Sequence, residues 1–174
     1  MIAVIDYDAG NTFNVLKAFQ HLGVDSVLTA DRDTILQADG VGLPGVGAVK
    51  AAMDTLKERK LVDVIKEVAV QGTPLLGICL GMQMLFESSD EYGPTEGLGL
   101  IPGHVKLFPQ DLGLLVPHMG WNKNTLHKAD SIFAEAIQDQ YTYFVHSYYA
   151  DCPAEYITTT ADYGIEVPGL VERG

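Results

Sequence analysis

The segment Leu75-Leu76-Gly77-Ile78-Cys79-Leu80-Gly81-Met82-Gln83 places a cysteine between a short apolar run and the start of a helical pattern. This is the Gly-x-nucleophile-x-Gly form of a nucleophile elbow, in which the nucleophile occupies a strained turn between a strand and a helix. Glycines on both sides let neighbouring backbone pass without a clash from a Cβ atom. The helix N-terminus favours the thiolate form of Cys79, and the backbone N–H of Leu80 is well placed to receive an oxyanion. Cys79 is therefore the candidate nucleophile, with a buried structural cysteine as the alternative.

The chain before Cys79 alternates apolar, β-branched runs with helical stripes. Strands are predicted at residues 2–7, 24–28, 41–44 and 75–78, and helices at 12–22, 48–56 and 61–70. The helix that follows Cys79 is expected to carry Met82, Leu85 and Phe86, and the acidic run at 87–91 to be its solvated end. Strands that alternate with helices indicate an α/β fold, with a doubly wound, mostly parallel sheet and helices on both faces. Ligands of such sheets bind at the carboxyl ends of the strands, where Gly45 and Cys79 both fall.

The second half of the chain has a different character. Residues 98–163 form short segments punctuated by Gly and Pro and rich in Tyr and Thr, with one short helical pattern near residues 131–137. These features predict a β-rich region. No linker or repeat separates it from the first half, so residues 1–174 are expected to form a single domain.

Composition excludes several classes of function. The net charge is -12 and no basic run offsets it, which argues against nucleic acid or an anionic membrane as the main partner. Asp6 interrupts the apolar N-terminus before a signal peptide or a membrane span could form. The two cysteines show neither a disulfide framework nor metal-ligand spacing, which indicates the reducing cytoplasm and no metal. Cys152 lies beside Pro153 without an elbow and is expected to be structural.

Three further segments place polar groups where a ligand or a partner is expected to bind. Pro44-Gly45-Val46-Gly47 ends a strand and opens a helix, where backbone N–H groups form an anion site. It lacks the form of a nucleotide phosphate loop, and an ordinary turn is the alternative. Residues 117–122 and 143–148 combine aromatic and polar side chains, which is typical of a binding surface or of core packing around a satisfied histidine.

Together these segments resemble the class I, triad-type glutamine amidotransferases, which have a flavodoxin-like fold. Within that family they are most similar to the glutaminase subunits of imidazole glycerol phosphate synthases, which serve histidine biosynthesis. The elbow indicates the superfamily, and two further motifs narrow the resemblance to these subunits. The matching residues are Asp6-Tyr7 with Gly10-Asn11, Pro44 to Gly47, Gly77 to Gln83, Pro-His-Met-Gly-Trp-Asn at 117–122, and Tyr-Phe-Val-His-Ser-Tyr at 143–148.

The resemblance implies a role for each matching position. Cys79 would attack the side-chain amide of glutamine to form a thioester, which water then hydrolyses. No cofactor is implied, and the expected partner is a (β/α)₈-barrel cyclase subunit that receives the ammonia in a heterodimer. The implied positions are Gly45, Val46, Gly47 and Leu80 in the oxyanion hole, Gln83, Glu91, Ser147 and Tyr148 around glutamine, and Trp121, Asn122 and Tyr143 at the cyclase interface.

One part of the family pattern has no match. The family completes its triad with a His-Pro-Glu segment on a strand near the C-terminus, followed by a closing helix, and these 174 residues contain no His-Pro-Glu. We therefore expect the last strand and helix to be missing, the domain to be incomplete at its C-terminus, and the chain to be nearly inactive. Two alternatives stay open: a glutaminase of pyridoxal phosphate or GMP synthesis, and a non-catalytic binding protein on the same fold.

Overall fold

A computed structural model describes all 174 residues, which form two compact units, Met1–Leu100 and Ile101–Gly174. Each unit is described by itself, and the expectation of a single domain stays a prediction. None of the helices combines the length and the apolar character that crossing a bilayer requires.

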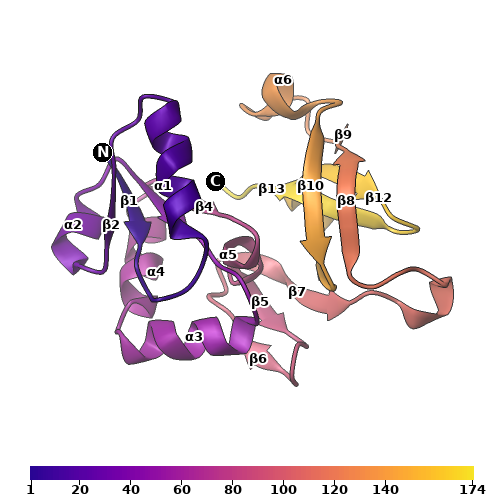
Figure 1. Cartoon of the computed structure of the whole chain (residues 1–174), viewed down its shortest axis with the longest axis horizontal. Coiled ribbons are helices and arrows are strands. Elements are labelled where there is room, and N and C mark those ends of the chain that lie inside the picture. The colour runs from indigo at the N-terminus through magenta and orange to yellow at the C-terminus, as the bar shows by residue number, and fades with distance from the viewer. The chain divides into compact units, whose positions relative to one another are not determined.

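The first unit is built on a four-stranded parallel sheet with the order β2-β1-β3-β4 (Figure 1). The register places Ile2 opposite both Ser26 and Gly40, and Val41 opposite Leu75. The prediction of an α/β fold with a parallel sheet is confirmed. The strands are β1 (Ile2–Ile5), β2 (Ser26–Thr29), β3 (Gly40–Leu43) and β4 (Leu75–Gly77), and the helices between them are α1 (Thr12–His21), α2 (Arg32–Leu36), α3 (Val49–Glu58) and α4 (Val62–Val70).

The core of this unit lies between the central strands and the helices α3 and α4. Ile5 and Leu43 on the sheet and Met53, Leu56 and Ile65 on the helices are at most 1% exposed. Helix α1 differs, because none of its residues is buried, although a helical stripe of apolar residues was predicted there. Leu22, just after this helix, is 71% exposed. The predicted end of α1 is correct, since Gly23 has a φ of +70° and the N–H of Val24 donates to the carbonyl of Phe19.

Two local predictions in this unit were wrong. Helix α5 (Leu80–Gln83) lasts only four residues, and Phe86 opens strand β5 (Phe86–Ser89), which pairs with β6 (Thr95–Glu96). The carbonyls of Met84 and Phe86 accept hydrogen bonds from Leu98 and Gly99, so long-range pairing overrides the helical pattern. The acidic run is therefore a strand and its turn, and not a helix end. Helix α2 was missed, although the Asp31 side chain caps it by accepting from the N–H of Thr34 at 2.9 Å.

The second unit is β-rich, as predicted (Figure 1). Strands β8 and β10 form a two-stranded antiparallel ribbon, β7 pairs with β11, and β12 lies between β13 and β9. The short helix α6 lies inside the predicted helical segment. The elements are β7 (Ile101–Leu107), η1 (Gln110–Leu112), β8 (His118–Lys123), β9 (Thr125–Leu126), α6 (Ala134–Ile137), β10 (Tyr141–His146), β11 (Tyr148–Asp151), η2 (Ala154–Tyr156), β12 (Ile157–Asp162) and β13 (Glu166–Val171).

Candidate active site

Cys79 occupies the turn between β4 and α5, with its side chain exposed. Its backbone has φ +57° and ψ −116°, a conformation that side-chain-bearing residues rarely adopt. Such strain persists only where the surrounding structure over-determines it, and it concentrates at functional sites. The backbone therefore has the strained turn that the elbow pattern predicted.

The glycines on both sides of Cys79 allow backbone segments to approach more closely than any other residue would permit. A Cβ atom on Gly81 would lie 1.8 Å from the carbonyl oxygen of Leu43, at the end of β3. A Cβ atom on Gly77 would lie 2.8 Å from the backbone of Gly81 and Met82. Both substitutions require the backbone to shift, so the elbow is packed directly against the strand that leads into the Pro44–Gly47 loop.

The Pro44–Gly47 loop contacts the elbow through the backbone. The N–H of Leu80, the predicted oxyanion donor, donates to the carbonyl of Gly45 at 3.3 Å. A Cβ atom on Gly45 would lie 3.0 Å from the backbone nitrogen of Gly81. Farther along the loop, Val46 is 55% exposed and Gly47 has a φ of +90°. The structure thus brings the loop and Leu80 together. In this arrangement, however, the N–H of Leu80 already donates to the carbonyl of Gly45 and is not available to an oxyanion.

Tyr7 fixes the buried end of this loop. Its side chain is fully buried, and its hydroxyl donates to the carbonyl oxygen of Pro44 at 2.6 Å. Burial raises the pKa of Tyr7 to about 12, so the phenol stays a neutral donor at physiological pH. The sequence showed Tyr7 only as part of a family motif. Its role becomes visible once the fold places β1 beside β3.

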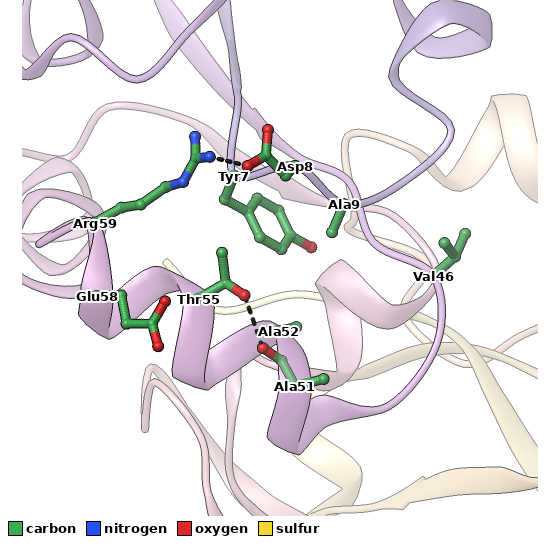
Figure 2. Close-up of a pocket in the computed structure, with 9 residues that line it drawn as sticks. All are labelled: Tyr7, Asp8, Ala9, Val46, Ala51, Ala52, Thr55, Glu58 and Arg59. Atoms are coloured by element: carbon green, nitrogen blue, oxygen red, sulfur yellow. Dashed lines mark hydrogen bonds and ion pairs between the residues drawn. The ribbon is translucent and has the colours of Figure 1, made fainter.

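A cavity of about 400 Å³ lies beside Tyr7 (Figure 2). Val46 of the loop and Ala9 line one side of it, and Ala51 and Ala52 of α3 line another. At the opposite end Arg59 forms an ion pair with Asp8. The small side chains leave open space next to the loop that carries Val46.

The predicted substrate positions are distributed over both units. Gln83 is half-buried at the end of α5, and Glu91 is half-buried in the turn after β5. Burial raises the pKa of Glu91, an effect that a hydrogen bond from the Val49 backbone partly offsets. Ser147 lies between β10 and β11, and Tyr148 opens β11; both are half-buried.

The predicted interface residues lie on the β8–β10 ribbon. Trp121 and Tyr143 face each other across the two strands in a T-shaped contact with 5.5 Å between ring centroids. They are 69% and 51% exposed. Three further exposed side chains continue this face at alternate positions: Met119, Tyr141 and Val145. The Asn122 side chain instead turns to the other face, where its Oδ1 lies 2.8 Å from His118 Nε2.

None of the five histidines is bonded to Cys79. His21 ends α1, about 15 Å along the helix from the carboxyl edge of the sheet. His118 and His146 are bonded to each other at 3.0 Å, and His127 bonds to Thr160 at 2.7 Å. His104 lies on β7 in the second unit. The first unit, which holds the nucleophile, therefore offers Cys79 no imidazole as a base.

The second cysteine fits the structural role expected for it. Cys152 is half-buried, and burial together with the charge of Asp151 raises its pKa to about 11. Few thiolates form at such a site near neutral pH.

Comparison with known proteins gives a consistent family assignment. The family model described as "Glutamine amidotransferase class-I" matches residues 3–174. The chain is 56% identical over 173 residues to the protein of Lactiplantibacillus plantarum named imidazole glycerol phosphate synthase subunit HisH, covering 99% of this chain and 83% of that protein. It is 51% identical over 174 residues to the HisH subunit of Listeria monocytogenes, covering 100% and 83%.

Solved structures agree on the fold. A crystal structure of a glutamine amidotransferase superimposes with a TM-score of 0.75 at 16% identity, covering 100% of this chain and 86% of the other. PurLQS from Thermotoga maritima gives a TM-score of 0.67 at 18% identity, covering 97% and 76%. At such identities the likeness establishes the fold alone.

Proposed function

Because this chain belongs to the class I glutamine amidotransferase family, alongside the HisH subunits of imidazole glycerol phosphate synthase, we propose that it acts on glutamine through Cys79. It is the glutaminase subunit that supplies ammonia to a cyclase subunit in histidine biosynthesis. The observation that carries the proposal is the strained elbow at Cys79, packed against the Pro44–Gly47 loop. A free thiol nucleophile without a cofactor suits the reducing cytoplasm, which we propose as its location.

The thiolate of Cys79 attacks the side-chain amide carbon of glutamine, and the C–N bond breaks as ammonia leaves. Water then hydrolyses the γ-glutamyl thioester and releases glutamate. The N–H of Leu80 and those of the Gly45, Val46 and Gly47 loop stabilise the oxyanion in both steps. The hydrogen bond from the Leu80 N–H to the Gly45 carbonyl must first break before Leu80 can bind the oxyanion. Gly47, which already has a positive φ, gives the loop backbone the freedom to turn.

The substrate contacts follow from chemistry at the matching positions. The Glu91 carboxylate is suited to the ammonium group of glutamine, and binding that cation would favour its ionised form. Gln83, Ser147 and Tyr148 supply amide, hydroxyl and backbone groups for the remaining polar atoms of the substrate.

The β8–β10 face is the proposed contact with the (β/α)₈-barrel cyclase in a heterodimer. Trp121 and Tyr143 present large aromatic surfaces of the kind that dominate binding energy at interfaces. Asn122 supports this face from behind through its bonds to His118 and the Asp162 carbonyl.

The sheet order supports the finer prediction of a doubly wound fold. In the order β2-β1-β3-β4, the chain moves one way from β1 to β2 and the other way from β2 to β3 and from β3 to β4. Right-handed crossovers then place α1 on one face of the sheet and α2, α3 and α4 on the other.

We also propose that these 174 residues turn over glutamine very slowly, because they lack the His-Pro-Glu segment of the family and the first unit places no histidine beside Cys79. Losing the base of a nucleophile–base pair costs on the order of 10⁴-fold or more in rate. Glutamate release should therefore be close to background with the chain alone and with the cyclase added. Turnover equal to that of the Lactiplantibacillus plantarum relative would contradict this proposal.

A covalent glutamine analogue tests the assignment of Cys79 separately from turnover. 6-Diazo-5-oxo-L-norleucine alkylates a thiolate in a glutamine site, with loss of nitrogen gas. Mass spectrometry should find one label on Cys79 of the native chain and of the Cys152→Ser variant, and none on Cys79→Ser. Glutamine should slow the labelling. Equal labelling of Cys152, or no protection by glutamine, would overturn the assignment.

The second candidate, a glutaminase of another synthase, makes a different prediction about partners. Binding of the chain to purified cyclase, compared with pyridoxal phosphate synthase and GMP synthase, discriminates between them. The Pro-His-Met-Gly-Trp-Asn segment at residues 117–122 favours the cyclase.

A further inference from the structure

The hydrogen bonds of two histidines in the second unit do not balance if both rings are neutral. His118 of β8 and His146 of β10 are register partners, and His118 Nδ1 lies 3.0 Å from His146 Nε2. The outer nitrogen of each ring has a partner of its own. His146 Nδ1 lies 2.7 Å from the carbonyl oxygen of Tyr148, and His118 Nε2 lies 2.8 Å from Asn122 Oδ1.

Each outer contact requires a proton on the ring nitrogen. The carbonyl of Tyr148 can only accept, so His146 Nδ1 carries a hydrogen. The amide of Asn122 is oriented by its Nδ2 group, which donates to the carbonyl of Asp162 at 3.3 Å. Its Oδ1 therefore faces His118 and accepts from Nε2. Both rings have now used the single N–H that a neutral imidazole has.

The inner contact then needs a third proton. Without one, the lone pairs of His118 Nδ1 and His146 Nε2 would face each other at 3.0 Å. We propose that His118 and His146 share one additional proton and form a single imidazole–imidazolium pair, which joins Asn122 to the backbone of Tyr148. Three protons on four ring nitrogens give the pair a charge of about +1.

The surroundings suit a buried cation of this shape. His118 is 1% exposed and stacks with two aromatic rings, Tyr163 at 3.9 Å and Phe144 at 5.1 Å between centroids, both nearly parallel to it. Phe108 packs against His146 at 5.1 Å. Aromatic faces attract a cation, and they offset part of the cost of burying it.

Burial lowers the pKa of His146, the bond to the Tyr148 carbonyl raises it, and the charge of His118 lowers it. Among titratable side chains, Tyr163 stacks on His118, and Tyr149 stacks on Phe108, which itself contacts His146.

The pair has a positioning role at the strand ends. His146 directly precedes Ser147 and Tyr148, and Asn122 directly follows Trp121. The bonded series Tyr148–His146–His118–Asn122 therefore connects the proposed substrate segment with the proposed cyclase face. This consequence rests on the proposed function, whereas the proton count does not, so the two can fail separately.

The test counts protonated ring nitrogens directly. Long-range ¹H–¹⁵N correlation spectra of the ¹⁵N-labelled 174-residue chain should be recorded at about pH 7.5, roughly one unit above the titration of an ordinary histidine. We expect three protonated nitrogens among the four ring nitrogens of the pair. Two protonated nitrogens in the native chain would overturn the proposal.

Matched variants sharpen the count. Asn122→Ala removes the acceptor from His118 Nε2, so His118 can carry its hydrogen on Nδ1 and the count should fall to two. Lys123→Ala, an exposed change on the same strand, should leave the count at three. Asn122→Asp places a carboxylate, which can only accept, beside His118 Nε2, so the count of protonated ring nitrogens should stay at three. A count of three in Asn122→Ala, or of two in Asn122→Asp, contradicts the proposal, and the aspartate variant alone decides if the alanine variant does not fold.

The positioning role has its own readout. Backbone amides of Ser147 and Tyr148 should exchange faster in Asn122→Ala than in Lys123→Ala at the same pH. Equal exchange rates would show that the charge of the pair does not stabilise the segment.

Discussion

Replacing Tyr7 by Phe tests whether the buried hydroxyl holds the Pro44–Gly47 loop. The change removes one oxygen and leaves the ring in place. The Pro44 carbonyl is buried and would lose the hydroxyl that donates to it at 2.6 Å. A buried acceptor left without a donor costs about 1–3 kcal/mol. We therefore expect Tyr7→Phe to lower the free energy of unfolding by about 2 kcal/mol.

The second unit offers a matched control for this change. The Tyr163 hydroxyl donates to the carbonyl of Leu115, also at 2.6 Å, but at an exposed site. Water can replace that donor, so Tyr163→Phe should cost only about 0.5–1 kcal/mol. Urea denaturation followed by circular dichroism measures both variants, with each unit monitored separately where the transitions do not coincide.

A second measurement places the effect at the loop. The Leu80 amide, bonded to Gly45, should exchange faster with deuterium in Tyr7→Phe than in the native chain. If Tyr7→Phe is no more destabilising than Tyr163→Phe and the Leu80 amide exchanges at the native rate, the hydroxyl does not anchor the loop.

Four further changes follow from the same structure. Gly81→Ala should destabilise the first unit by about 3 kcal/mol or more, because its Cβ would overlap the Leu43 carbonyl. The control Gly42→Ala, whose Cβ would lie 3.7 Å from Val4, should be tolerated far better in the same denaturation assay. The folded pKa of Tyr7, about 12, lies above the unfolded value of about 10, so the stability that its hydroxyl contributes is complete below about pH 10 and is lost as the pH rises towards 12. The difference in unfolding free energy between the native chain and Tyr7→Phe should therefore shrink between about pH 10 and 12. A constant difference would contradict this. At about pH 8, Cys152 in Cys79→Ser should react with iodoacetamide some 10²-fold more slowly than a free thiol, since only ~10⁻³ of it is thiolate at a pKa of about 11; comparable rates would refute its burial. Trp121→Ala should weaken cyclase binding by about 2 kcal/mol in titration calorimetry, whereas Ile132→Ala, at an 88% exposed position of the same unit, should not; equal effects would remove the β8–β10 face from the interface.

The sequence predicted the central elements because their signals are local. Glycines flank Cys79, β-branched residues mark β1, and Gly23 follows the end of α1. Glycine permits the positive φ or the close backbone approach that these turns need, and β-branched side chains favour extended backbone.

The features that were missed depend on long-range contacts. Phe86 begins a strand because residues 95–99 supply its hydrogen-bonding partners, which a helical pattern does not reveal. The anchoring role of Tyr7 arises from Pro44, 37 positions away. The orientation of Asn122 depends on His118 and the Asp162 carbonyl, so its side chain lies on the opposite face of β8 from Trp121. The family resemblance implied an interface role for both Trp121 and Asn122, whereas adjacent residues of a strand place their side chains on opposite faces.

The size of each effect decides which of them limits the proposed reaction. Opening the oxyanion site breaks the bond from Leu80 to Gly45, which costs about 0.5–1.5 kcal/mol net and lowers the open fraction by at most roughly tenfold. The proposed absence of a base would lower the rate by on the order of 10⁴-fold. Loop closure is therefore the smaller barrier by about three orders of magnitude. If the proposed lack of a base holds, a variant that opens the loop, such as Tyr7→Phe, should not restore glutamine turnover to these 174 residues, even where it exposes the Leu80 N–H.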